Sequence, residues 1–190
     1  MKICITGHTA GIGKAFAEVL GDRGHDIVGL SKRDGHNIRN IPKILEHIKP
    51  CDMWINNAQS GFAQTELFYA VWNHWQKTEK TIWVISTAMT QDYDIANVET
   101  MKQSDILEYR TQKRALEEAV HSVKQISTLP RVCIIRPGKV ATQPGEVAHQ
   151  QGADASEWAN TVVNMYNQCR EYQLLPSELS LIYSKNAPNL

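Results

Sequence analysis

The sequence predicts an α/β fold in which helices cover both faces of a doubly wound parallel sheet. Short apolar runs alternate with segments whose apolar residues recur every three or four positions, which is the pattern of strands alternating with helices. The first apolar run, at 3–5, leads through a glycine-rich turn into a segment of helical spacing. Because 190 residues suffice for one full core, we expect a single domain over residues 1–190.

Composition and charge exclude several classes of function. Lysine plus arginine and aspartate plus glutamate each total 20, so the balanced charge supports neither nucleic acid nor a membrane as a partner. No apolar run approaches the roughly 20 residues of a membrane span, and we expect no signal peptide before the first strand. Scattered cysteines without a C-x-x-C pair favour free thiols in a cytoplasmic protein. The histidines form no ligand cluster, so we expect no metal.

The glycine-rich turn at 6–13 reads TGHTAGIG and connects the first strand to the first helix. Glycine tolerates a positive φ and lets a ligand approach the backbone closely. The helix points unpaired N–H groups and the positive end of its dipole at the turn, so a phosphate group fits there. Glycines that serve packing alone are the structural alternative. The candidate cofactor-binding residues of this turn are Gly7, Thr9, Gly11, Ile12 and Gly13.

The second strand, at 26–30, ends at the polar run Ser31-Lys32-Arg33-Asp34. About 20 positions after a dinucleotide-binding turn, an acidic residue usually holds the ribose 2′-hydroxyl, whereas arginine accommodates a 2′-phosphate. Ser31, Lys32 and Arg33 therefore favour a 2′-phosphate. Asp34, which glycine follows, is typical of a turn. A solvated Lys-Arg turn is the structural alternative.

A helix is expected to be missing after the second strand. A parallel crossover needs roughly a dozen residues or more, and the segment 31–37 leaves no room for a helix. We therefore expect a short third strand at 36–38. The pattern then predicts a helix from Ile41, with Pro42 in its first turn, and a strand over 52–58.

The same alternation continues through the middle of the chain. A helix around 67–75 carries a stripe of large apolar side chains, which we expect in the core or in a subunit contact. A strand at 81–85 precedes Ser86. The polar segment 87–104 that follows is a candidate substrate wall, because long loops on a rigid scaffold often carry function.

The next predicted helix carries Tyr109 and Lys113, which lie one turn apart on the same face. Ser104 and Asp105 are candidate caps of this helix. Such a Tyr-x-x-x-Lys pair also occurs by chance in many proteins, so its meaning depends on the motifs around it.

The last third of the chain contains two more predicted strands and a helix. A strand at 131–135 leads into a loop through 142, and a brief loop follows at 143–153. The residues Asp-Ala-Ser-Glu at 154–157 resemble a capping box and start a helix through about residue 172. The segment 178–183 is the predicted edge strand.

Four motifs occur in the order in which the short-chain dehydrogenase/reductase family has them, and the chain resembles a shortened member of that family. They are the turn at 6–13, Asn-Asn-Ala at 56–58, Tyr-x-x-x-Lys at 109–113 and Pro-Gly-x-Val-x-Thr at 137–142. The resemblance covers residues 3–142. It implies a Rossmann-type sheet with a dinucleotide across the carboxyl ends of its strands.

The sequence departs from the family pattern at three places. The helix after the second strand is deleted. Gln59 stands where the family has a glycine after Asn-Asn-Ala. No residue of the helix at 67–75 matches the asparagine that completes the family's catalytic tetrad, and Asn73 is the nearest candidate.

The resemblance implies hydride transfer between a nicotinamide and a carbonyl or alcohol carbon, and residues 31–33 favour NADP over NAD. Tyr109 would donate the proton, and Ser86 would hydrogen-bond the substrate oxygen. Lys113 would hold the nicotinamide ribose and lower the pKa of the phenol, which is ordinarily about 10. The resemblance adds these residues to the cofactor-binding set: Asn37, Asn57, Ala58, Lys113, Pro137, Gly138, Val140 and Thr142.

Two other classes of function are open. A catalytically silent NADP-binding sensor or regulatory module fits the deletions and Gln59. An epimerase or dehydratase, as among the longer relatives, would need a substantial substrate domain that we do not expect here. We also expect a homo-oligomer, because relatives pair through the helices that here carry Trp72, Trp75 and residues 109–126, and a tryptophan-rich face is costly to leave in water.

Overall fold

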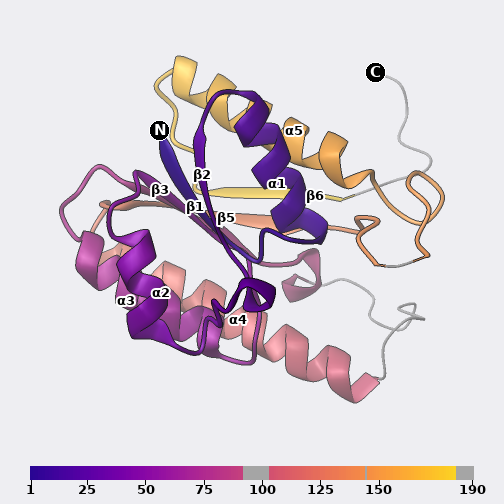
Figure 1. The fold of residues 1–190 in the computed structure, drawn as a ribbon, viewed down its shortest axis with the longest axis horizontal. Helices are drawn as coiled ribbons and strands as arrows, with labels where there is room; N and C mark the ends of the chain where they lie inside the picture. The colour runs from indigo at the N-terminus through magenta and orange to yellow at the C-terminus, as the bar shows by residue number, and fades with distance from the viewer. Residues whose placement is uncertain (92–102, 144, 183–190) are drawn as a thin grey trace.

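The computed structural model describes residues 1–91, 103–143 and 145–182, and its centre is a six-stranded sheet (Figure 1). The strands are β1 Lys2–Thr6, β2 Asp26–Leu30, β3 Met53–Asn56, β4 Thr81–Ile85, β5 Arg131–Pro137 and β6 Glu178–Leu181. Their order across the sheet is β2-β1-β3-β4-β5-β6, and every neighbouring pair is parallel. The carboxyl ends of all these strands therefore lie along one edge of the sheet.

Helices cover both faces of this sheet. They are α1 Gly11–Asp22, α2 Ile41–Ile48, α3 Ala63–Trp75, α4 Gln103–Ile126 and α5 Ala155–Glu171, with 3-10 turns η1 Lys32–Asp34 and η2 Ala88–Thr90. Figure 1 shows α1 and α5 together on one face, and α2, α3 and α4 on the other. The doubly wound parallel fold predicted from the sequence is confirmed.

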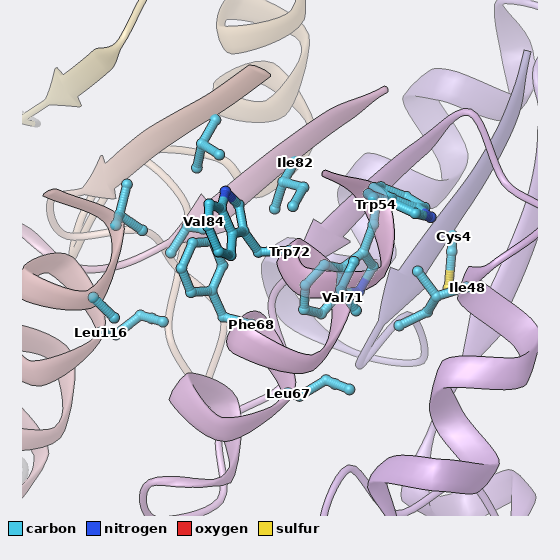
Figure 2. Close-up of a cluster of buried hydrophobic side chains, with 14 of the residues drawn as sticks. Cys4, Ile48, Trp54, Leu67, Phe68, Val71, Trp72, Ile82, Val84 and Leu116 are labelled. Carbon is cyan, nitrogen blue, oxygen red and sulfur yellow. The ribbon is translucent and has the colours of Figure 1, made fainter. Parts of the chain in front are cut away.

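Each face of the sheet has its own hydrophobic core, because successive strand residues point to opposite faces. In β1, Cys4 belongs to the core under α2, α3 and α4, whereas Ile3 and Ile5 belong to the core under α1 and α5. Figure 2 shows the first of these cores, in which Trp54 of β3 and Phe68 of α3 are both fully buried. Burial on both faces explains why the strands have nearly continuous apolar sequences.

The tryptophans of α3 belong to the same core. Trp72, which Figure 2 labels, is 6% exposed and Trp75 is 1% exposed, and both belong to this core. The apolar stripe of this helix is therefore core. Of the two places expected for it, the core or a subunit contact, it occupies the first, so these tryptophans give no support to the predicted homo-oligomer.

The connection after β2 confirms the missing helix but contains no third strand. The chain makes the 3-10 turn η1, which Ser31 caps, and then reaches α2 without pairing with the sheet. One turn precedes the segment predicted as extended, where Gly35 has φ +79°, and a second lies within it, where Asn37 Oδ1 accepts a hydrogen bond from the N–H of Arg39 at 3.0 Å. Ile38 is instead buried in the core beside α2. The strand predicted at 36–38 is therefore wrong.

Of the two helix starts predicted from capping residues, that of α5 is confirmed and that of α4 is wrong. Asp154 caps α5, and its Oδ1 accepts from the N–H groups of Ser156 at 2.9 Å and Glu157 at 3.0 Å. Ser104 and Asp105 lie inside the first turn of α4, so they do not precede the helix as caps. Most of the predicted substrate wall, residues 92–102, lies outside the described residues, as does the predicted end of the edge strand at 183.

The described part of the chain has no helix that is both long and apolar enough to cross a membrane. All four cysteines are free, and Cys4, Cys51 and Cys133 are buried. Burial raises the pKa of the Cys133 thiol to about 12, so this thiol is protonated at neutral pH.

Candidate active site at the carboxyl ends of the strands

The glycine-rich turn packs tightly between β1 and α1. Gly7 and Gly11 have φ values of +78° and +54°, a conformation that side chains disfavour. A Cβ on Gly13 would lie 2.2 Å from the carbonyl oxygen of Gly7, so α1 starts directly against the turn. Among the described residues, no side chain caps α1. The first N–H groups of the helix are therefore available to an anionic ligand.

Asn57 and Ala58, which follow β3, hold this turn in place. The Asn57 side-chain amide donates to the carbonyl oxygens of Thr6 at 3.0 Å and Gly7 at 3.4 Å. The backbone N–H groups of Asn57 and Ala58 donate to Thr6 Oγ1 at 3.1 and 3.3 Å. The structure thus brings the first two motifs together at the point where the strand order reverses direction, between β1 and β3.

The polar run after β2 lies beside the same turn. Ser31 Oγ is 3.0 Å from Thr9 Oγ1 and accepts a hydrogen bond from the N–H of Arg33. Lys32 and Arg33 are exposed, and no carboxylate of the described residues forms an ion pair with either. Two hydroxyls and two cations therefore gather at this end of the site.

Asp34, the acidic residue of that run, lies close to His8. Its carboxylate is 3.7 Å from His8 Nε2. The His8 imidazole in turn covers Gly29 of β2, where a Cβ would lie 2.3 Å from the ring. Asp34 is thus a neighbour of the glycine-rich turn as well as a turn residue.

The loop that follows β5 reaches the glycine-rich turn from the other side. The N–H of Gly138 donates to the carbonyl of Leu181 at 2.8 Å. Thr142 Cβ is 3.3 Å from the place where a Cβ on Gly11 would stand. Val140, only 8% exposed, packs into the core of α1 and α5. The predicted Thr142 is therefore next to the turn, whereas Val140 has a packing role.

Pro137 and Ile12 are packed into the fold, and the Asn37 side chain forms a hydrogen bond within its own turn. Pro137 is the last residue of β5 and is buried. Ile12 is partly buried against the core of α1 and α5. The Asn37 side-chain oxygen accepts its hydrogen bond from Arg39, as described above. No described hydrogen bond joins Asn37 to another predicted cofactor residue.

Tyr109 and Lys113 lie at the end of β4. Lys113 is 3% exposed, and its Nζ donates to the carbonyl of Ile85 and to Gln64 Oε1, both at 2.8 Å. The same Nζ is 5.6 Å from the centroid of the Tyr109 ring. The structure therefore brings the Tyr-x-x-x-Lys pair to the edge of the sheet where the other motifs gather.

Burial changes the protonation of both side chains. It lowers the pKa of Lys113 to about 7, and the Glu117 carboxylate partly opposes this change. Burial raises the pKa of Tyr109, and a hydrogen bond with Thr87 partly opposes this. The expected lowering of the phenol pKa by Lys113 is not seen, because the ammonium lies against the ring and donates to Gln64 and a backbone carbonyl.

No hydrogen bond between described residues joins Ser86 to Tyr109. Ser86 is 1% exposed, and its hydroxyl donates to the carboxylate of Glu117. The next residue, Thr87, forms the hydrogen bond with Tyr109. Sequence reasoning chose the first hydroxyl after the strand and missed the second. Both hydroxyls bond to side chains of α4, Ser86 to Glu117 and Thr87 to Tyr109, so the choice depended on how this helix lies along the end of the strand.

Gln64 is the second residue that sequence reasoning missed. It is 2% exposed in the first turn of α3, and its amide donates to the carbonyls of Asn56 at 2.8 Å and Ile85 at 3.2 Å. Its Oε1 accepts from Lys113. Asn73, the residue suggested by the sequence, is exposed and bonds to Gln76. Gln64, and not Asn73, is therefore the amide that supports Lys113.

Gln59 reaches across the end of the sheet to α4. Its amide donates to Gln112 Oε1, and Gln112 donates to Glu108 at 2.8 Å. The longer side chain thus bridges β3 and α4 beside the Tyr-x-x-x-Lys pair. Within the described residues, no group of three or more histidine, cysteine or carboxylate side chains could hold a metal ion.

No protein-family model matches the sequence, and no curated protein matches it either. Solved structures match the fold over its whole length. An alcohol dehydrogenase from the archaeon Thermococcus sibiricus, complexed with 5-hydroxy-NADP, is 15% identical with a TM-score of 0.76, and the match covers 100% of both chains. A short-chain dehydrogenase/reductase from Vibrio parahaemolyticus is 13% identical with a TM-score of 0.74, over 96% of this chain and 99% of that one. A 4-hydroxyisoleucine dehydrogenase complexed with NADH is 14% identical with a TM-score of 0.70, over 99% of each chain. The fold is therefore that of short-chain dehydrogenases.

Proposed function

We propose that this protein is an NADP-dependent oxidoreductase that transfers a hydride between a nicotinamide and a carbonyl or alcohol carbon of a small molecule. The observation that carries this proposal is the gathering of Thr87, Tyr109, Lys113 and Gln64 at the edge of the sheet that also holds the glycine-rich turn. Ligands of open α/β sheets bind at this edge, at the point where the strand order reverses. The fold is shared with dehydrogenases solved with nicotinamide cofactors.

The residues present fit a dinucleotide phosphate. A side chain at Gly13 would collide with the turn, and the uncapped start of α1 offers N–H groups to the pyrophosphate. Ser31, Lys32 and Arg33 offer a hydroxyl and two cations to a 2′-phosphate. This set supports NADP over NAD.

When bound, NADPH would supply the hydride to the carbonyl carbon. Tyr109 would give its proton to the carbonyl oxygen, so that an alcohol and NADP⁺ result. Burial raises the pKa of Tyr109, so the phenol holds at neutral pH the proton that the reductive direction requires. We assign to Thr87 the contact with the substrate oxygen that the sequence assigned to Ser86.

Lys113 and Gln64 would have supporting roles beside Tyr109. Gln64 and the Ile85 carbonyl fix the position of Lys113 Nζ, which would hold the nicotinamide ribose. Gln64 thereby takes the place of the asparagine for which the sequence has no match.

The experiment that tests this function is a screen of carbonyl compounds with NADPH oxidation as the readout. Tyr109→Phe keeps the packing of the ring, so NADPH binding should persist while kcat falls by about 10²- to 10⁴-fold. Tyr69→Phe, at an exposed tyrosine of α3, is the matched control and should be silent. Thr87→Val should also lower kcat with cofactor binding retained.

Unchanged turnover in Tyr109→Phe would contradict the proposed acid. Tight NADPH binding in all forms, without reduction of any compound, would favour the alternative of a catalytically silent NADP-binding sensor. Failure of the wild-type chain to bind NADPH or NADH would refute both.

A further inference from the structure

Glu117 is a buried carboxylate that the proposed chemistry does not use. It lies on α4 one turn after Lys113 and is 8% exposed. The hydroxyls of Ser86 and Thr90 donate to its Oε1, the latter at 2.8 Å. Arg136 donates from Nε to Oε1 and from Nη2 to Oε2, each at 2.9 Å. A buried charge needs such partners, and here they come from the end of β4 and from β5.

The two hydroxyl partners flank the residue that bonds Tyr109. Ser86 precedes Thr87, and Thr90 closes the 3-10 turn that follows it. The segment after β4 is therefore anchored to α4 on both sides of the Thr87 hydroxyl. Because Tyr109 is on α4 as well, Glu117 connects the segment that carries Thr87 to the helix that carries Tyr109.

The arginine partner extends the same network to the cofactor loop. Arg136 Nη1 donates to Glu178 of β6 at 2.6 Å, so the guanidinium is held from two sides. Pro137 and Gly138 follow Arg136 directly and begin the loop whose Thr142 lies over the glycine-rich turn. One carboxylate thus joins the end of β4, α4 and the start of this loop.

We propose that Glu117 is a positioning residue that holds Thr87 and the loop at 137–142 in register with Tyr109 and Lys113. The inference rests on the proposed function, because it assigns a role within that site. Glu117 acts through its three hydrogen-bond partners and does not touch the substrate.

Glu117 also influences the charge of Lys113. It raises the pKa of Lys113, against the effect of burial. The other groups around Lys113 are the neutral amide of Gln64 on α3, a backbone carbonyl of β4 and the neutral phenol of Tyr109 on α4, with Arg136 of β5 beyond the carboxylate. Loss of the carboxylate should therefore make Lys113 release its proton at lower pH.

Three variants separate positioning from stability. Glu117→Gln keeps the side-chain volume and removes the charge. Ser86→Ala combined with Thr90→Val removes both hydroxyl contacts and leaves the pair of Glu117 and Arg136 intact. Glu118→Gln, at the exposed neighbour on the same helix, is the matched control. For each we would measure kcat, NADPH affinity, the thermal midpoint and the titration of Lys113 by lysine-selective NMR.

In Glu117→Gln, kcat should fall about 10²-fold, the effect of a misplacement of roughly 1 Å. The Lys113 titration should move about one pH unit lower. In the double variant, kcat should fall by roughly ten- to a hundredfold while NADPH affinity and the Lys113 titration stay as in the wild type. The control Glu118→Gln should match the wild type in every measurement.

A double variant with wild-type kcat would overturn the proposal, whether or not Glu117→Gln folds. So would a Glu117→Gln protein that is less stable but keeps its kcat and its Lys113 titration, because Glu117 would then be a structural ion pair only. If the wild-type chain reduces no carbonyl compound, the proposed function fails. The Lys113 titration in Glu117→Gln would still decide whether this carboxylate sets the charge of that lysine.

Discussion

Lys113→Met should stabilise the fold at neutral pH, although it removes a side chain that the proposed reaction needs. Burial lowers the pKa of Lys113 from 10.5 to about 7. Since each pKa unit corresponds to about 1.4 kcal/mol, folding around the ammonium costs about 5 kcal/mol below neutral pH. The variant leaves Gln64 Oε1 without its donor, at a cost of roughly 1–3 kcal/mol. A net gain of about 2 kcal/mol is expected at pH 7.

This gain should disappear as the pH rises. Below the folded-state pKa of about 7, both the folded and the unfolded chain carry the Lys113 ammonium, so the whole penalty applies. Between that pKa and 10.5 only the unfolded chain holds the proton. The free energy of unfolding of the wild type then increases by about 1.4 kcal/mol per pH unit, whereas Lys113→Met lacks this contribution.

Urea denaturation followed by tryptophan fluorescence, at pH 7, 8 and 9 and constant ionic strength, measures the difference between the two proteins. Because Lys113 is half protonated at pH 7, the difference should change by about 2 kcal/mol from pH 7 to pH 9 in favour of the wild type. Lys14→Met, at an exposed lysine of α1, is the control and should give a constant difference. A constant difference for Lys113→Met would refute the reasoning, because Lys113 would then have an ordinary pKa in the folded chain.

Three further predictions test the cofactor end of the site and the assembly. Arg33→Ala should weaken NADPH binding by about ten- to a hundredfold in a fluorescence titration and leave NADH binding unchanged, and equal effects on both would contradict the 2′-phosphate contact. Gly13→Ala should abolish NADPH binding, because the new Cβ would stand 2.2 Å from the Gly7 carbonyl oxygen. In the control Gly21→Ala the new Cβ would lie 3.9 Å from its nearest neighbour, so this variant should bind NADPH normally. We expect a homo-oligomer, so light scattering should detect a species larger than the 21.4 kDa chain. A purely monomeric protein would show that prediction to be wrong.

Local sequence determined most of the secondary structure. The apolar runs at 26–30 and 81–85 coincide with β2 and β4, and Asp154 caps α5 as its position before Glu157 suggests. The glycine-rich turn was also recognisable, because strand, turn and helix follow one another within a few residues. Such features depend on contacts between near neighbours, which the order of residues reveals directly.

Only the tertiary structure decided which polar side chains meet. Ser86 and Thr87 are equivalent in sequence, but the packing of α4 on the strand end gives Glu117 to the first and Tyr109 to the second. Gln64 reaches Lys113 across 49 positions of the chain. Such pairings depend on how helices pack on the sheet, so no local pattern of residue types contains them.

The tertiary structure also decided whether residues 36–38 form a strand. Its sequence permits an extended strand, and a neighbouring crossover helix would be needed to carry it to the sheet edge. Without that helix, Gly35 and Asn37 form turns, and Ile38 enters the core beside α2. Local propensity allowed a strand here, but the length of the connection and the burial of one isoleucine determined that none formed.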